Sequence, residues 1–167
     1  MAVSVELVRN LRDQTGAGIM DCKDALEKSG GDMEKAVLAL REKGVASVAK
    51  RAGKDTNEGV IDTYLHTGGR VGAIVELGCE TDFVARTEEF QKLAHEIAMQ
   101  VAAMAPLYVD ADEIEEGDTR PPAQITLMQQ PFIKNSSSSV GEMVKELAAK
   151  VGENIRVVRF SRLAVGE

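Results

Sequence analysis

The segment at residues 80–86 reads Glu80-Thr81-Asp82-Phe83-Val84-Ala85-Arg86. It follows a strongly apolar stretch, residues 71–79, and precedes the longest amphipathic pattern of the chain, residues 87–105. A stretch that is apolar at nearly every position is typical of a strand in the middle of a sheet. Apolar residues at spacings of three and four predict a helix that buries one face. The sequence therefore predicts a strand, a polar junction and a long helix in succession, and such a junction exposes side chains on a rigid base.

The ring of Phe83 lies in this polar junction and has two interpretations. It is either an anchor of the hydrophobic core beneath the start of the helix or a group presented to a partner. Val, Ile, Leu and Ala side chains can fill the space between the strand and the helix, and Phe90 gives the helix an aromatic anchor of its own. This weakens the need for Phe83 in the core, but the residues alone leave both interpretations open.

The junction belongs to a predicted α+β core at residues 54–167. Residues 59–66 predict a strand that returns as residues 71–79 through a glycine-rich turn. The last strand is predicted at residues 155–163, with a bulge at Val157-Val158 because the alternation of apolar and polar residues breaks there. We expect a small, mostly antiparallel sheet with helices packed on one face.

The segment between the long helix and the last strand is less regular. Residues 123–130 are ambiguous, and residues 130–133 predict an extended arm. Ser139 and Glu142 form a capping box at the start of a helix, and Gly152 is its predicted stop. The core is thus predicted to follow the order β-β-α-α-β.

Residues 1–53 predict a module of three short helices followed by a basic connector. The helices are expected at residues 4–14 and 19–27 and from the cap Asp32 to about Gly44, which is taken as the stop of the third helix. The connector, residues 45–53, is rich in Ala and basic side chains, and a helical conformation stays open for it. A module of this size buries little surface and is marginally stable alone.

The composition disfavours several classes of protein. The formal net charge of −7 disfavours direct nucleic-acid binding, which needs a cationic face. We expect no membrane association, because the longest apolar run is interrupted by Pro106 and the N-terminus lacks a signal-peptide core. Two distant cysteines, Cys22 and Cys79, fit reduced and buried thiols in a cytoplasmic protein.

Motifs for catalysis or cofactor binding are weak. Gly16-Ala17-Gly18 fails as a dinucleotide fingerprint, since Asp21 occupies the place of the third glycine. The acidic run at residues 110–118 lacks the spacing of a calcium loop. A nucleophilic pair of Cys79 and His95 stays open, although a buried thiol and a surface imidazole are favoured. We expect no catalytic residue, metal or cofactor, and the residues favour a non-enzymatic protein that offers surfaces to a partner.

Two motifs together resemble the elongation factor Ts family of translation. The first is residues 11–26, LRDQTGAGIMDCKDAL, and the second is residues 80–86, quoted above. The resemblance continues through residues 40–44 and 130–132, so it covers most of the chain. Departures are small: Thr87 stands where the family usually has Asn. The chain has room for one core subdomain, so it resembles the short form, in which two copies pair.

The resemblance implies a function as guanine-nucleotide exchange factor for elongation factor Tu, bound either to GDP or to no nucleotide. The N-terminal module, which resembles a ubiquitin-associated domain, would dock on the GTPase domain of that partner. Asp82 and Phe83 would be pushed beside the magnesium site, and Thr81 and Val84 would shape and support this wedge. The contact of the N-terminal module would contain Ile19, Met20 and Lys23. A bacterial-type cytoplasm is expected, with an organellar matrix or stroma as the other setting.

Two other functions compete with this one. In the first, the three-helix module is a binding adaptor for another protein and the core only dimerises. In the second, the chain is a small thiol enzyme that uses Cys79. Recovery of a translational GTPase in a pull-down would argue against the adaptor, and burial of the thiol would argue against the enzyme.

Overall fold

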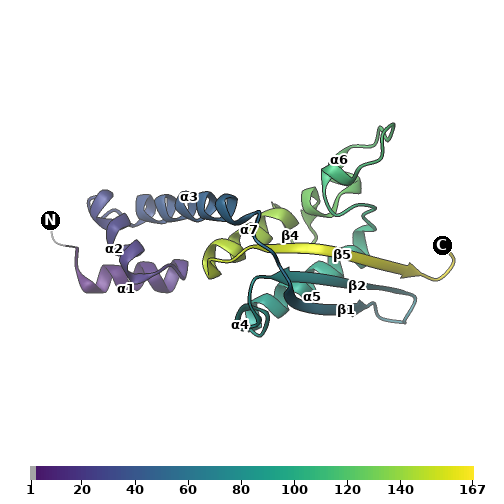
Figure 1. Cartoon of the computed structure of the whole chain (residues 1–167), viewed down its shortest axis with the longest axis horizontal. Helices are drawn as coiled ribbons and strands as arrows, with labels where there is room; N and C mark the ends of the chain where they lie inside the picture. Colours follow the sequence, from purple (N-terminus) through teal and green to yellow (C-terminus); the bar gives the residue numbers. More distant parts are fainter. Residues whose placement is uncertain (1–2) are drawn as a thin grey trace.

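One unbroken helix, α3 (Met33–Arg51), connects an N-terminal group of helices to an α+β core (Figure 1). The structure is a computed structural model and describes residues 3–167. Within these residues, none of the helices combines the length and the apolar character needed to cross a bilayer. The α+β class predicted from the sequence is confirmed. The division into residues 1–53 and 54–167 stays a prediction.

The N-terminal group consists of α1 (Val5–Thr15), α2 (Ile19–Lys28) and the first half of α3. Its small core of buried side chains contains Leu11, Cys22, Leu26 and Ala36. The helices begin where the sequence predicts, because Ser4 and Asp32 accept hydrogen bonds from the N–H groups of Leu7 and Lys35.

The predicted end of the third helix near Gly44 is wrong, since α3 continues to Arg51 and includes most of the expected connector. Gly44 does not end the helix; it allows α3 to pack closely against α7. A Cβ atom placed on it would lie 2.8 Å from the Cβ of Ala149 in α7 (Val140–Val151). A residue without a side chain lets the two helices approach, at the cost of some helix propensity.

The sheet of the core has the strand order β1-β2-β5 and is antiparallel throughout. Its strands are β1 (Glu58–Leu65), β2 (Val71–Cys79) and β5 (Ile155–Ala164). The apolar β2 lies in the middle, as its sequence predicts. The predicted bulge is confirmed, because Glu76 pairs with Arg159 while Leu77 pairs with Val157, which leaves Val158 as the extra residue.

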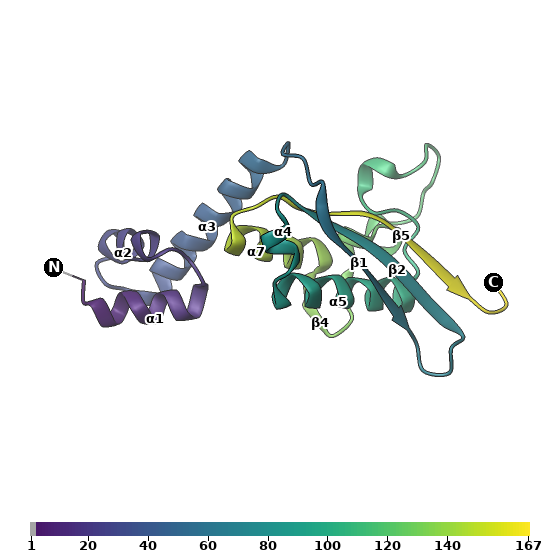
Figure 2. The same cartoon turned by 60° about the horizontal axis from the view of Figure 1, so that its bottom comes forward.

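Helices α5 (Glu88–Met104) and α7 cover one face of the sheet (Figure 2). The side chains buried between sheet and helices include Val75, Leu77, Phe90 and Val144. The other face of the sheet is uncovered in the single chain. It carries three rows of paired residues: Ile61, Glu76 and Arg159; Thr63, Ile74 and Ser161; Leu65, Gly72 and Leu163.

The segment between α5 and α7 forms short elements, and α6 with its neighbouring loop projects from the core (Figure 1). The elements are η1 (Ala111–Glu113), α6 (Pro122–Ile125), η2 (Leu127–Gln129), β3 (Pro131–Phe132) and β4 (Asn135–Ser139). The predicted extended arm is confirmed as β3. The run of serines at residues 136–139 pairs with it as part of β4. The buried amide of Gln100 fixes this arm, since it donates to the carbonyl of Pro131 and accepts from the N–H of Ile133.

The expected capping box is present at the start of α7. Ser139 accepts a hydrogen bond from the N–H of Glu142, and the Glu142 carboxylate accepts one from the N–H of Ser139. The hydrogen bond from the N–H of Ser139, with a weaker one from its hydroxyl, holds the pKa of the Glu142 carboxyl below its usual range. Gly152 ends the helix with a φ of +74°, as predicted.

Candidate functional site

The polar junction after β2 folds into a single helical turn, α4 (Asp82–Ala85). Successive residues of such a turn point in different directions, so Val84 and Ala85 are buried while Phe83 points outward. The side chain of Phe83 is 79% exposed. The interpretation of this ring as a core anchor is therefore wrong. Val84 lies in the core beneath the turn, at the position expected of a supporting residue.

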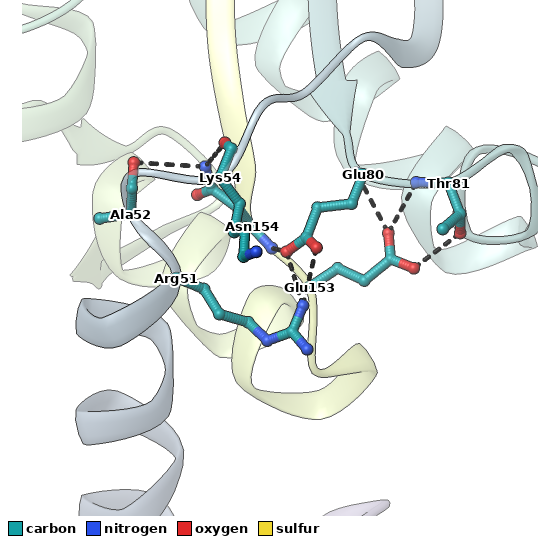
Figure 3. A network of polar contacts seen from close by, with 7 residues as sticks. All are labelled: Arg51, Ala52, Lys54, Glu80, Thr81, Glu153 and Asn154. Carbon is teal, nitrogen blue, oxygen red and sulfur yellow. Dashed lines mark hydrogen bonds and ion pairs between the residues drawn. The ribbon is translucent and has the colours of Figure 1, made fainter.

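The carboxylate of Glu153 fixes the backbone just before α4 (Figure 3). Its Oε2 accepts hydrogen bonds from the N–H of Glu80 at 3.2 Å and of Thr81 at 3.1 Å. Its Oε1 accepts a hydrogen bond of 2.6 Å from the hydroxyl of Thr81. Hydrogen bonds to an ionised acceptor are stronger than neutral ones. Thr81 is thus held at two atoms, and the N–H of Glu80 at a third, by one side chain from the turn between α7 and β5.

The side chain of Glu80 also contacts the turn between α7 and β5, and it contacts the end of α3 as well (Figure 3). Its Oε1 accepts a hydrogen bond of 2.6 Å from the N–H of Asn154. Both of its oxygens accept from Nη1 of Arg51, at 2.8 and 2.7 Å. The N–H of Asn154 and the guanidinium of Arg51 hold the pKa of the Glu80 carboxyl below its usual range. The junction, the α7–β5 turn and the end of α3 therefore form one hydrogen-bonded unit.

Asp82 lies beside Phe83 at the start of α4. Its Oδ2 is 2.9 Å from Nη2 of Arg86, one turn along the chain, and both side chains are well exposed. Exposed ion pairs of this kind contribute little and are exchanged easily for other partners. The carboxylate of Asp82 is therefore accessible to a second molecule.

The residues expected in the second contact lie at the start of α2. Ile19 is 54% and Met20 is 64% exposed. Nζ of Lys23 is 3.8 Å from Oε1 of Glu27, and both of these side chains are half exposed. Two apolar side chains and one cation thus form a small exposed surface, separate from the junction in sequence and carried by another part of the fold.

Comparison with known proteins shows which family carries these two exposed surfaces. The family profile described as elongation factor TS matches residues 19–121 of the chain, which include both exposed surfaces. The chain belongs to the elongation factor Ts family. This membership places it among the proteins of translation elongation and confirms the resemblance seen in the sequence.

Relatives named elongation factor Ts match the chain over its full length. The protein of Synechococcus sp. (strain JA-3-3Ab) is 46% identical over 198 positions, which cover 100% of this chain and 70% of the relative. The proteins of Thermotoga petrophila and Thermotoga maritima are 45% and 46% identical over 195 positions, which cover 100% of this chain and 98% of each relative. These alignments are longer than the 167-residue chain, by 31 and 28 positions, so this member lacks internal positions that the relatives contain.

Cys79 of this elongation factor Ts family member does not have the surroundings of a nucleophile. The buried thiol of Cys79 donates to the carbonyl of Thr81 at 3.1 Å. Burial, together with the charge of Glu153, raises the pKa of this thiol to about 11, whereas a reactive cysteine needs a lowered value. The imidazole of His95 lies against Asp62 and Tyr64 instead. Within residues 3–167, no three His, Cys, Asp or Glu side chains are grouped in a way that would hold a metal ion.

Sequence reasoning missed the residues that support the junction. Arg51, Glu153 and Asn154 lie 29 to 74 positions from Glu80 or Thr81 along the chain. Their types are common on protein surfaces, and no local pattern marks them. One signal was present: Glu80 is a carboxylate directly after a buried strand, and such a group needs a cation and N–H donors nearby.

Proposed function

We propose that the chain is a guanine-nucleotide exchange factor for elongation factor Tu and that Phe83 and Asp82 act at the magnesium site of that GTPase. The ring of Phe83 enters between side chains of the partner, and the carboxylate of Asp82 accompanies it. Thr81 and Val84 hold the turn that carries them. Ile19, Met20 and Lys23 supply the second contact, with the GTPase domain.

The proposed mechanism needs no covalent chemistry from this chain. GDP is held in a GTPase largely by contacts of its phosphates with magnesium and with backbone N–H groups. Displacing the ion leaves phosphate charge less neutralised, so GDP dissociates faster. The coupling is reciprocal: the factor weakens GDP binding by some ratio, and GDP weakens binding of the factor by the same ratio. GTP then binds the empty site and releases the factor.

The observation that carries the proposal is the exposed ring of Phe83 on a fixed backbone. At 79% exposure Phe83 leaves most of its apolar surface in water, so covering that surface by a partner is favourable. Thr81, two residues before Phe83, donates two hydrogen bonds to the carboxylate of Glu153, and the burial of Val84 and Ala85 holds the turn on its core side. A preorganised side chain loses little conformational freedom on binding.

The test is the release of labelled GDP from elongation factor Tu, measured at increasing concentrations of factor. Phe83→Ala is expected to leave the circular dichroism spectrum unchanged and to lower the maximal release rate by about tenfold or more, as for loss of a buried aromatic contact. Leu38→Ala is the matched control, because Leu38 is 59% exposed on α3 outside both proposed contacts. Equal release rates for Phe83→Ala and the wild type would refute the wedge. Absence of acceleration by the wild type would favour the binding adaptor.

We also propose that two copies of the chain pair through the uncovered face of the sheet. This face presents Ile61, Ile74 and Leu163 to solvent, and Leu163 is 78% exposed. Apolar residues that recur on one face of a sheet are normally covered by a second layer. Ile74→Asp, in the middle row, is expected to give a monomer by sedimentation analysis, with Leu38→Asp as the control. A dimer that persists in Ile74→Asp would exclude this face. The cytoplasm or an organellar matrix, where elongation factor Tu works, is the proposed location.

A further inference from the structure

The exposed ring of Phe83 cannot owe its direction to its own packing. At 79% exposure the ring is surrounded mainly by water, so the backbone of α4 must set where it points. This helix has only four residues. A single turn is unstable by itself, because nucleation fixes several dihedral angles for one hydrogen bond. The residues that hold the turn from outside therefore determine how the ring is presented.

Two groups of contacts hold the turn, and they act on different atoms. Val84 and Ala85 fix the side that faces the core, because both are buried. The start of the turn is fixed at Thr81, the N-cap, whose own side chain does not cap the turn. The hydroxyl and the N–H of Thr81 are both committed to Glu153. The entry of the chain into α4 is thus determined by one carboxylate.

We propose that Glu153 is a positioning residue for nucleotide exchange, which acts by fixing Thr81 and thereby the direction of Phe83. This inference rests on the proposed exchange function and adds to it a residue far from the two motifs that define the family resemblance. Glu153 is half-buried, and its carboxylate is engaged by donors of Glu80 and Thr81 (Figure 3). Its effect on the partner is therefore indirect.

Glu153 is itself held in place, which is what a positioning residue requires. It follows Gly152, the residue that ends α7 in the left-handed conformation, and precedes Asn154, which is 5% exposed. The N–H of Asn154 donates to Glu80, while the N–H of Glu80 donates to Glu153. The two turns therefore exchange hydrogen bonds in both directions, and neither can shift without breaking bonds to an ionised group.

The side-chain amide of Asn154 extends this hold to the segment after α3. It donates to the carbonyl of Lys54 at 2.8 Å and to that of Ala52 at 3.4 Å. Arg51 neutralises Glu80 on the same side. Three segments that are distant in sequence thus fix the base of the wedge (Figure 3).

The test is a double-mutant cycle between Glu153→Gln and Phe83→Ala, read as release of labelled GDP from elongation factor Tu. Gln keeps the size of Glu but offers one acceptor oxygen and places an NH2 group against N–H donors. Glu153→Gln is expected to lower the maximal release rate about tenfold and to change the half-saturating concentration less than about twofold. In the Phe83→Ala background the same substitution is expected to change the maximal rate less than about twofold. The control is Glu116→Gln, on the exposed acidic loop, which is expected to change neither parameter.

Each other outcome overturns the inference. An unchanged rate in Glu153→Gln would show that the carboxylate is dispensable. An equal loss in both backgrounds would show that it acts independently of the ring, as a general effect on folding or affinity would. If Phe83→Ala alone leaves the rate unchanged, the exchange mechanism itself fails and the positioning role fails with it.

A milder variant covers the case in which Glu153→Gln does not fold. Thr81→Val removes the 2.6 Å hydroxyl bond and keeps the shape of the side chain. Its maximal rate is expected to fall about threefold, with the loss again absent in the Phe83→Ala background. A rate equal to that of the wild type would overturn the inference as well.

Discussion

Replacing Gly44 by Ala tests how the N-terminal helices are attached to the core. Gly44 lies inside α3, where Ala would normally stabilise a helix. The added Cβ would lie 2.8 Å from the Cβ of Ala149, closer than carbon atoms in contact, which are about 3.5 to 4.0 Å apart. The two helices must therefore separate by about 1 Å to admit the methyl group.

Two opposing effects set the size of the change. Loss of a helix-interior glycine stabilises by about 0.8 to 1.0 kcal/mol. Overpacking of a tight contact costs about 1 to 3 kcal/mol. The expected result is a net loss of about 1 kcal/mol in the free energy of unfolding. The separation also moves Arg41 away from Glu146, but this pair is exposed and contributes little.

The assay is urea unfolding followed by circular dichroism, because the chain contains no Trp. Ala46→Gly, at an exposed position of the same helix, measures the helix-propensity effect alone. Ala149→Gly removes the atom that the new methyl group meets. In the double variant of Gly44→Ala with Ala149→Gly the contact is restored, and a coupling of about 1 to 3 kcal/mol is expected.

If Gly44→Ala raises the free energy of unfolding by as much as Ala46→Gly lowers it, the predicted overpacking at Gly44 is refuted. Strict additivity in the double variant would refute it too. Either result would mean that α3 and α7 do not touch at Gly44.

Three other predictions concern the surface and the titrating groups. Met20→Ala is expected to raise the half-saturating concentration in the GDP-release assay about tenfold at an unchanged maximal rate, since it removes only contact area; a lower maximal rate would contradict a docking role. The pKa of Glu80 is lower in the folded chain than in the unfolded chain. The ionised carboxylate therefore stabilises the fold above the unfolded-state pKa of about 4.3. This stabilisation is lost as the pH falls through the pKa of the folded state. Wild-type stability should therefore fall more between about pH 6 and about pH 3 than that of Glu80→Gln, and parallel curves would contradict this. In a Cys22→Ser background, Cys79 should react with iodoacetamide about a hundredfold more slowly in the native than in the unfolded chain, because its pKa is raised to about 11; equal rates would refute its burial.

Local signals in the sequence predicted most of the elements. The capping box of Ser139 and Glu142, the stop at Gly152 and the bulge at Val157-Val158 depend on neighbours within a few residues. The central position of β2 followed from its apolar sequence, which is typical of a strand in the middle of a sheet. These features could be predicted because their causes lie inside the segments themselves.

The sequence did not predict features whose causes lie elsewhere in the chain. Gly44 resembles a helix stop until Ala149, 105 positions away, is placed beside it. The serine run at residues 136–139 has no apolar pattern, and it becomes a strand only because β3 offers a pairing edge. At the site, Phe83 could be singled out by its rarity and position. Glu153 could not, because one carboxylate in a turn gives no indication of the three donors it will meet.

The continuity of α3 has a consequence for how the two exposed surfaces would engage one partner. A helix of 19 residues is about 28 Å long and stiff. A flexible linker of the same number of residues would let the two surfaces search independently. A stiff rod sets their separation in advance, so the first contact brings the second to a high effective concentration. With the proposed contacts, association is bivalent. A partner whose two binding patches lie at a different spacing can engage only one surface at a time, so the length of α3 contributes to specificity.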